Sequence, residues 1–214
     1  MTTSTGAPRK FAVCWSGGSG VAYGRRLVEV LLATGNEVHL TVSGAALRVL
    51  EHEDGVRVAD LDCGLPGLFA ADLRERLRVH ELDAVEATPA SGSAGIAAVV
   101  VVPCSMGTLA RIAVGASRNL IERAADVAIK EGRPLVVVPR ETPLSAIHLQ
   151  NMLTLARLGA VVLPAMPGFY HRPATVADLV DFVVGKVLDR LGVDHDIVRR
   201  WQTPAAAEDD GGEA

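Results

Sequence analysis

Short apolar runs alternate with segments of helical periodicity along most of the chain. Strands are predicted at residues 11–15, 37–42, 97–102, 135–138 and 160–163, with a weaker candidate at 78–82. Helices are predicted at residues 21–33, 45–51, 67–77, 144–158 and 176–191, and a further helix-like segment carries Arg123 and Lys130. This alternation, with no internal repeat, is typical of βα units joined into a parallel sheet.

The strands at 97–102 and 135–138 are apolar at every position, which indicates that both of their faces are covered by helices. We therefore expect an α/β fold, a Rossmann-like or flavodoxin-like doubly wound parallel sheet in three αβα layers. A single domain is predicted over residues 10–201, after a flexible leader at 1–9 and before a disordered acidic tail at 202–214.

Composition excludes several partners. The net charge is −4, and the four acids among the last seven residues account for it, so the body is close to neutral. No basic run stands out, which argues against nucleic acid as a partner. The longest apolar run, residues 94–102, is too short to span a membrane. Three cysteines without a CxxC spacing favour a reducing compartment, and we expect a cytoplasmic protein.

Candidate chemistry begins directly after the first predicted strand. Residues 16–20 read SGGSG and lead into a helix, so free backbone N–H groups and the positive end of the helix dipole meet there. That arrangement favours an anion at Gly17, Gly18 and Ser19, with Ser19 supplying a hydroxyl. The spacing is not GxGxxG and no Walker lysine follows, so a simple tight turn is an equally good interpretation.

Other strand ends carry similar polar groups. They are Ser43, residues 103–108, the Arg140–Glu141 pair and residues 164–171. Because the carboxyl ends of parallel strands share one edge of a sheet, these groups are expected to lie together where such folds bind ligands. Helix capping remains the alternative role for Ser43 and for residues 103–108.

Six motifs together resemble one known family. They are SGGSG at 16–20, PASGS at 89–93, PCSMGTLA at 103–110, ERAADVAIKE at 122–131, PRETPLS at 139–145 and PGFYHRP at 167–173. In this order they resemble the UbiX-type flavin prenyltransferases, part of the homo-oligomeric flavin-containing Cys decarboxylase-like flavoproteins. The resemblance implies transfer of a dimethylallyl group from dimethylallyl phosphate to N5 and C6 of reduced FMN, without a metal. It also implies a homododecamer built from trimers, and a UbiD-type decarboxylase that receives the prenylated FMN.

The resemblance also implies roles for individual residues. The catalytic residues would be Ser19, Lys130 and Glu141. FMN would be held by Gly17, Gly18, Ser19, Ser43, Ser91, Ser105, Met106, Gly107, Thr108 and Arg140. The prenyl phosphate would be bound by Arg123, Lys130, Tyr170, Lys186 and Trp201. For the proton at flavin C6, Glu141 with the released phosphate as relay is favoured over Ser19 or phosphate alone.

Helix geometry adds an expectation about Lys130. Arg123 and Lys130 are seven residues apart, so they share a helix face about 10 Å apart along the axis. In a βαβ unit the helix runs antiparallel to its strands, which puts Arg123 near the site edge and Lys130 at the opposite end from Glu141. If Lys130 is catalytic, it is therefore expected to serve a neighbouring subunit.

Two rival functions are compatible with a flavin fold. The first is an FMN-dependent decarboxylase of a cysteine-containing substrate, for which His39 and His52 are poorly placed. The second is a non-catalytic flavin-binding regulatory subunit, which would have no use for Lys130, Glu141 and Tyr170 together.

Overall fold

A six-stranded parallel sheet forms the centre of the molecule. The computed structural model describes residues 7–198, so Trp201, the predicted tail and most of the predicted leader lie outside the described residues. The strands are β1 (Lys10–Trp15), β2 (Glu37–Val42), β3 (Leu77–His80), β4 (Ile96–Cys104), β5 (Leu135–Pro139) and β6 (Val161–Val162). Their spatial order is β3-β2-β1-β4-β5-β6 and every neighbouring pair is parallel. This is the doubly wound Rossmann order, and the predicted fold class is confirmed.

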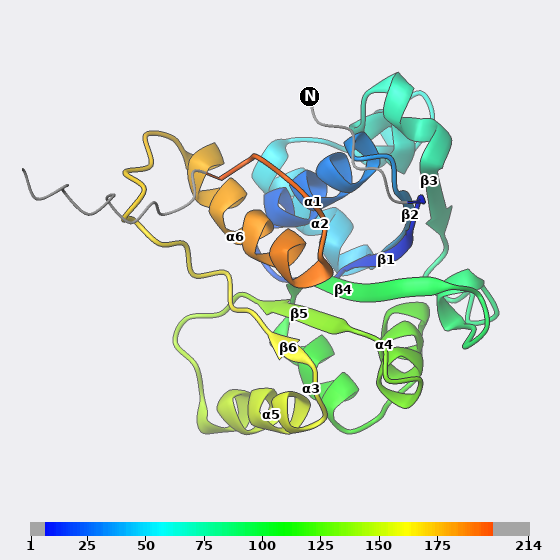
Figure 1. The fold of residues 1–214 in the computed structure, drawn as a ribbon, viewed down its shortest axis with the longest axis vertical. Coiled ribbons are helices and arrows are strands. Elements are labelled where there is room, and N and C mark those ends of the chain that lie inside the picture. Colours follow the sequence, from blue (N-terminus) through cyan, green and yellow to red (C-terminus); the bar gives the residue numbers. More distant parts are fainter. Residues whose placement is uncertain (1–6, 199–214) are drawn as a thin grey trace, which may run out of the picture.

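Helices cover both faces of the sheet (Figure 1). They are α1 (Val21–Ala33), α2 (Gly44–Asp54), α3 (Met106–Ala113), α4 (Leu120–Lys130), α5 (Ala146–Arg157) and α6 (Val176–Leu191). Helices α1, α2 and α6 lie on one face, and α3, α4 and α5 lie on the other. The three-layer arrangement follows from strands that are apolar on both sides.

Alternate residues of β1 feed two separate cores. Phe11, Val13 and Trp15 are buried in the cluster with α1 and α6, whereas Ala12 and Cys14 face the cluster with α3 and α4. Burying a large apolar side chain of this kind stabilises the fold by about 1.5–3 kcal/mol. The two cores hold β1 rigidly, and with it the loop that follows its carboxyl end.

The predicted helix at residues 67–77 is wrong. Two 3₁₀-helices, Leu65–Leu68 and Ala71–Arg76, take its place. Phe69 between them is extended (φ −116°, ψ 154°), and its carbonyl accepts a hydrogen bond from the Arg74 Nε at 2.8 Å. Pro66 and Gly67 disfavour a continuous α-helix at this point.

The predicted strand at residues 160–163 is shorter than expected. Only Val161 and Val162 pair with β5 as a regular strand. Beyond them, the backbone N–H of Leu163 still donates to the Val137 carbonyl at 2.9 Å. The backbone N–H of Ala165 likewise donates to the Pro139 carbonyl at 3.0 Å, so contact with β5 continues beyond the regular strand.

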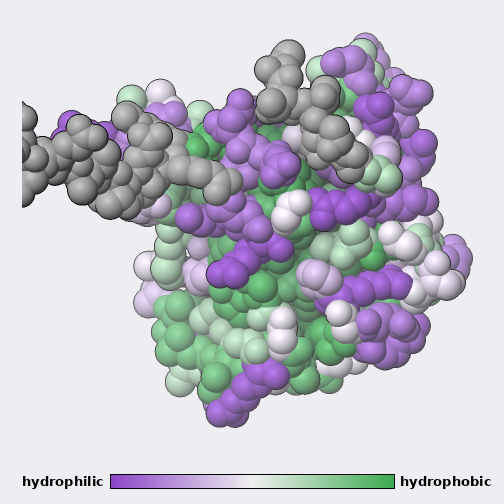
Figure 2. Space-filling view, in the orientation of Figure 1, coloured by the Kyte–Doolittle hydropathy of each residue, from purple (hydrophilic) through white to green (hydrophobic). Residues whose placement is uncertain are grey.

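Figure 2 shows hydrophobic residues gathered on the surface over α5. Ile147, Leu149 and Leu153 of this helix are 72%, 53% and 44% exposed. Among the helices of residues 7–198, none is both long and apolar enough to cross a membrane. The cytoplasmic location stays a prediction.

A stacked histidine pair lies on the outer strands β2 and β3. The rings of His39 and His80 are 5.1 Å apart and almost parallel, with Nδ1 of His39 2.8 Å from Nε2 of His80. The other nitrogen of His39 lies 2.7 Å from the Glu37 carboxylate. Burial lowers the pKa of both imidazoles below the ordinary 6.5. At His39 the Glu37 carboxylate raises the pKa, and the positive charges of Lys10 and Arg78 lower it. Burial is the largest effect, so the pKa of His39 stays lowered.

This pair predicts a loss of stability in mild acid. A base whose pKa is lowered by folding binds fewer protons in the native state, so stability falls as the pH drops below about 6.5. We expect the thermal midpoint of the wild-type protein to drop between pH 7.5 and pH 5.5, and that of His39→Gln to drop less. The control is His52→Gln on the exposed surface of α2. Equal drops in wild type and His39→Gln would contradict the prediction.

Candidate functional site

Four loops meet at the carboxyl edge of the sheet, the edge where β1, β2, β4 and β5 end. The backbone N–H of Ser16 donates to the Pro103 carbonyl at 3.1 Å, which joins the loops after β1 and β4. The backbone N–H of Ser43 donates to the Trp15 carbonyl at 2.9 Å, which adds the loop after β2. The Arg140 Nε lies 3.4 Å from the Ser19 carbonyl, which adds the loop after β5. The loops that follow these four strands therefore lie together at one edge of a single chain.

Glycines allow these loops to approach one another. A Cβ on Gly17 would lie 2.6 Å from the Cβ of Ala45, closer than real Cβ atoms come. A Cβ on Gly18 would lie 3.4 Å from both the Pro103 Cβ and the Ser105 N. The backbone of this loop is thus exposed to whatever binds at the edge, without side chains in the way.

Replacing Gly17 with alanine is therefore expected to disturb the site. The extra methyl must push α2 away, which costs about 1–3 kcal/mol of folding free energy by overpacking and shifts the loop. We expect a lower thermal midpoint and weaker flavin binding, measured by quenching of flavin fluorescence. Gly44→Ala is the matched control, because its Cβ would meet only the Arg48 Nη1 at 3.9 Å. Unchanged affinity and stability in Gly17→Ala would refute the tight approach.

An anion already lies on the N-terminus of α1. The Glu53 carboxylate accepts hydrogen bonds from the backbone N–H groups of Gly20, at 2.9 and 3.0 Å, and of Val21, at 3.1 Å. Burial would raise the pKa of Glu53. The Ser19 side chain, these N–H groups and the positive charge of Arg140 outweigh that effect and hold the pKa below its usual range. The end of the first loop therefore carries backbone donors of the kind that bind an anion, and Glu53 occupies them in this structure.

Sequence reasoning missed Glu53. It lies near the end of α2, between His52 and Asp54, where an acidic residue normally faces solvent. Its contact with α1 depends on how the two helices pack. No spacing or composition signal marked it.

The hydroxyl groups at this edge cap helices, as the alternative interpretation expected. Ser43 accepts from the Ala46 N at 3.1 Å, and Ser105 accepts from the Thr108 N at 3.4 Å. In each case the hydroxyl oxygen accepts, so its hydrogen stays available to a second partner. The Ser105 hydroxyl donates to the Thr108 Oγ1 at 3.1 Å. Capping and ligand contact are therefore compatible for Ser43, whereas the hydrogen of the Ser105 hydroxyl is engaged by Thr108.

Met106 and Gly107, which follow β4 at the start of α3, differ in their exposure to solvent. Met106, the first residue of α3, is only 7% exposed and packs in the core. Gly107 is exposed at the first turn of α3. The flavin contact of Met106 stays a prediction.

Glu141 follows Arg140 at the same edge. Its Oε1 accepts from the backbone N–H of Thr142 at 3.0 Å, so the carboxylate folds back over its own loop. Arg123, in the first turns of α4, is paired with Asp126 at 3.0 Å.

Ser91 and Lys130 lie at the opposite, amino edge of the sheet. The Arg133 guanidinium holds the loop of Ser91 through the carbonyls of Ser91 and Gly92. Lys130, at the end of α4, is paired with Glu131 at 3.0 Å, and a Cβ on Gly92 would touch the same Glu131 carboxylate. Ser91 does not join the carboxyl-edge residues of its own chain, because its loop precedes β4 whereas they follow strands. Its contact with the flavin stays a prediction.

Tyr170, in the loop between β6 and α6, and Lys186, on α6, share a third location. Both contact the Phe182 ring: the Tyr170 ring packs edge-on with centroids 5.6 Å apart, and the Lys186 Nζ lies 5.8 Å from its centroid. His171 stacks on Phe182 at 5.3 Å. Trp201, predicted to join them, lies outside the described residues.

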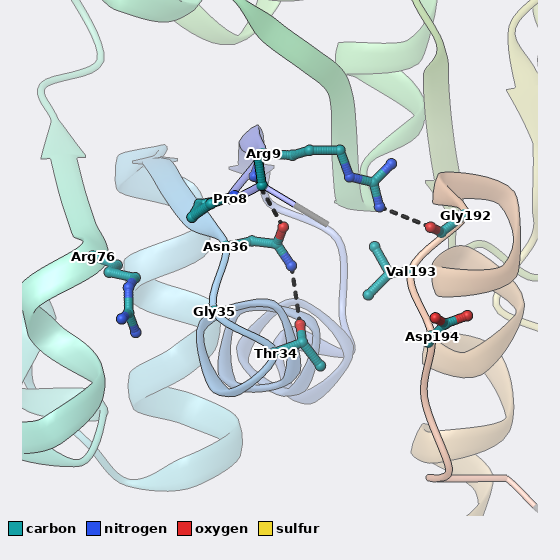
Figure 3. A pocket seen from close by; sticks show the side chains of 10 residues that line it. Pro8, Arg9, Thr34, Gly35, Asn36, Arg76, Gly192, Val193 and Asp194 are labelled. Atoms are coloured by element: carbon teal, nitrogen blue, oxygen red, sulfur yellow. Dashed lines mark hydrogen bonds between the residues drawn. The ribbon is translucent and has the colours of Figure 1, made fainter. Parts of the chain in front are cut away.

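A cavity of about 510 Å³ lies away from all these groups (Figure 3). It is lined by Arg9, Asn36 and Arg76 together with the turn after α6. The Arg9 guanidinium binds the Leu191 carbonyl at 2.9 Å and the Gly192 carbonyl at 2.8 Å. Arg9 and Asn36 immediately precede β1 and β2, so the cavity opens at the amino edge and includes none of the predicted site residues.

Comparisons with known proteins identify the family of the chain. The Flavoprotein family model matches residues 2–188. A flavin prenyltransferase UbiX of Halalkalibacterium halodurans is 49% identical over 191 residues, covering 89% of this chain and 92% of the relative.

Two solved structures are also similar. The crystal structure of AnUbiX (PadA1) in complex with FMN and dimethylallyl pyrophosphate has a TM-score of 0.82 and 36% identity, covering 92% of this chain and 99% of the other. A dodecameric FMN-dependent Ubix-like decarboxylase from Escherichia coli O157:H7 has a TM-score of 0.80 and 42% identity, covering 91% and 100%.

Proposed function

The chain belongs to the flavoprotein family of the UbiX flavin prenyltransferases, and from that premise we propose how its residues carry out the transfer. It is a flavin prenyltransferase whose flavin is FMN. The finer proposal is that a dimethylallyl group passes from dimethylallyl phosphate to N5 and C6 of reduced FMN. The observation that carries it is the anion-binding turn of Gly20 and Val21, which lies beside the Ser19 and Arg140 groups.

The residues of the carboxyl edge fit FMN. A flavin mononucleotide needs an anion site, hydroxyl donors and a surface without protruding side chains. Arg140 contacts the Ser19 carbonyl and offers a positive charge, the N–H groups at the start of α1 would bind the phosphate only if it displaced Glu53, and Ser43 and Thr108 offer hydroxyl groups. Gly17 and Gly18 keep the loop free of side chains. We assign FMN to this edge.

When bound, reduced FMN supplies the nucleophile. The chain's own residues must stabilise the leaving phosphate and accept a proton. We propose that Glu141 accepts the proton released from C6, with phosphate as its relay, and that Ser19 orients the reacting group. Glu141 is suited to this role because it lies next to Arg140 at the flavin edge.

Cationic residues bind the donor. Breaking an allylic C–O bond leaves charge on both fragments, and Arg123, Lys130 and Lys186 would stabilise the phosphate where water is excluded. Tyr170 can bond the phosphate and present a ring face to the allylic cation, worth about 0.5–2 kcal/mol. Trp201 would add a second aromatic ring beside the donor.

We propose that neighbouring subunits complete each site. Lys130 and the Ser91 loop lie together at the amino edge, clamped by Arg133 and Glu131, and they reach a flavin only if a second chain presents them. The E. coli relative is dodecameric, and the exposed apolar residues of α5 offer a surface for assembly. A homododecamer of trimers is the proposed assembly, and a UbiD-type decarboxylase is the proposed recipient of the product.

One anaerobic experiment tests the activity. Protein, reduced FMN and dimethylallyl phosphate are mixed, and the flavin is analysed by mass spectrometry; a parallel mixture contains the diphosphate. We expect the flavin to gain one prenyl unit with the monophosphate. A peptidyl or pantothenoyl cysteine is offered to the protein separately. If the flavin stays unmodified and this cysteine substrate releases CO₂, the decarboxylase is supported instead. Flavin binding with neither reaction would support the regulatory subunit.

A further inference from the structure

Glu122 is a fully buried carboxylate at the junction of α3 and α4. Its Oε1 accepts hydrogen bonds from the Arg111 Nε and, at 3.0 Å, from the Asn119 Nδ2. Its Oε2 accepts from the backbone N–H of Arg118 at 2.9 Å. Burial raises the pKa of Glu122, but the Arg111 hydrogen bond and its charge outweigh this and hold the pKa low. The carboxylate is therefore ionised, and its contacts replace the water it has lost.

Arg111 links Glu122 to Thr108 at the proposed flavin edge. Its Nη2 donates to the Thr108 Oγ1 at 3.2 Å while its Nε holds Glu122. The Thr108 oxygen also accepts from the Ser105 hydroxyl at 3.1 Å. With both lone pairs of that oxygen engaged, the Thr108 hydrogen is left to point to another acceptor.

The chain of contacts continues into the first loop. The backbone N–H of Ser105 donates to the Ser16 Oγ at 2.8 Å, and the Ser16 hydroxyl donates to the Pro103 carbonyl at 3.0 Å. Ser16 directly precedes Gly17. A buried charge on one helix junction is thus joined, through named hydrogen bonds, to two loops of the flavin edge.

Glu122 also lies in the first turn of α4. Asn119 caps this helix by accepting from the Glu122 N at 3.0 Å, and Arg123 is the next residue. A carboxylate near a helix N-terminus is favoured by the helix dipole. The contacts that hold Glu122 therefore also fix the direction in which the helix, and with it Arg123, begins.

We infer that Glu122 is a positioning residue, which acts through Arg111 to orient the Thr108 hydroxyl toward bound flavin. The inference rests on the proposed flavin site. If Glu122 served stability alone, an ion pair to Arg111 would suffice. The observed guanidinium, however, divides its nitrogens between Glu122 and Thr108.

A double-mutant cycle on flavin affinity tests this role. We measure the dissociation constant for FMN in wild type, Glu122→Gln, Thr108→Val and the double variant, and the thermal midpoint of each. We expect each single variant to weaken FMN binding about 5–30-fold, and the double variant to bind about as weakly as Thr108→Val alone. The inference would be overturned if the loss of FMN affinity in the double variant equalled the product of the two single losses. It would also be overturned if Glu122→Gln had a lower thermal midpoint but wild-type FMN affinity.

Arg111→Lys keeps the test decisive if Glu122→Gln fails to fold. Lysine retains the charge opposite Glu122 but lacks the second nitrogen that reaches Thr108. We expect near wild-type stability with FMN affinity lowered as in Thr108→Val; wild-type affinity would count against the relay. Glu29→Gln, which removes a similar ion pair to Arg25 on α1, is the control. A wild-type protein that binds FMN without transferring the prenyl group would refute the proposed function while leaving this cycle interpretable.

Discussion

Replacing Lys130 with alanine is expected to lower prenyl transfer by about 10²–10³-fold with little change in FMN affinity. Removing one preorganised charge from a leaving group typically costs that much, because the charge acts mainly in the transition state. Lys130 lies at the end of α4, away from the flavin loops of its own chain, so the flavin contacts should survive.

Two measurements separate these effects. Single-turnover transfer at saturating donor reports the chemical step, and fluorescence quenching reports FMN binding. Lys10→Ala, which removes another exposed lysine paired with a carboxylate, serves as the control. Removing even one donor that stabilises the transition state should lower the rate about a hundredfold. If Lys130→Ala retained more than about a third of the wild-type rate, Lys130 would therefore have no part in the reaction.

Changing Glu141 to glutamine should produce the second large loss. Glutamine keeps the size and most hydrogen bonds but cannot accept the proton, and general-base catalysis contributes about 10²–10⁴-fold. We expect both FMN and the donor to bind normally while the ring-closing step slows.

The species that accumulates tests that role. In Glu141→Gln the flavin should carry the prenyl unit without completing the ring. Glu51→Gln, a surface glutamate paired with Arg57, is the comparison. A wild-type rate of ring closure in Glu141→Gln would assign the proton to phosphate or to Ser19.

Local signals explain which elements were predictable. The predicted bounds of α1, β2 and α6 match the structure, and α6 shows why. Thr175 and Asp178 form a capping box at its start, and Gly192 ends it with φ 61°. Residues 65–76 carry no comparable periodicity, and their short helices depend on contacts such as that of Arg74 with Phe69.

The site was predictable where it follows strand ends and unpredictable where it depends on packing. Arg140 and Ser105 directly follow buried strands, so the topology alone places them. Glu53 and Glu122 enter through helix–helix contacts that no local pattern encodes. The motif containing Ser91 identifies the residue, but a motif does not say which edge of the sheet or which subunit presents it.

The central claim is that each active site is divided between chains. Arg140 and Glu141 lie at the carboxyl edge, while Lys130 and Ser91 lie together at the amino edge. Because the chain is rigid through its two cores, one subunit cannot bring these groups together. The claim predicts complementation between variants that are each inactive.

Co-expression of Lys130→Ala and Glu141→Gln subunits at equal levels tests this most directly. Differently tagged chains allow mixed oligomers to be purified and their prenyl transfer measured. If each site draws Lys130 and Glu141 from different subunits, about one quarter of randomly assembled sites are intact, and about a quarter of the wild-type activity should return. Mixed oligomers as inactive as either parent would contradict the shared site.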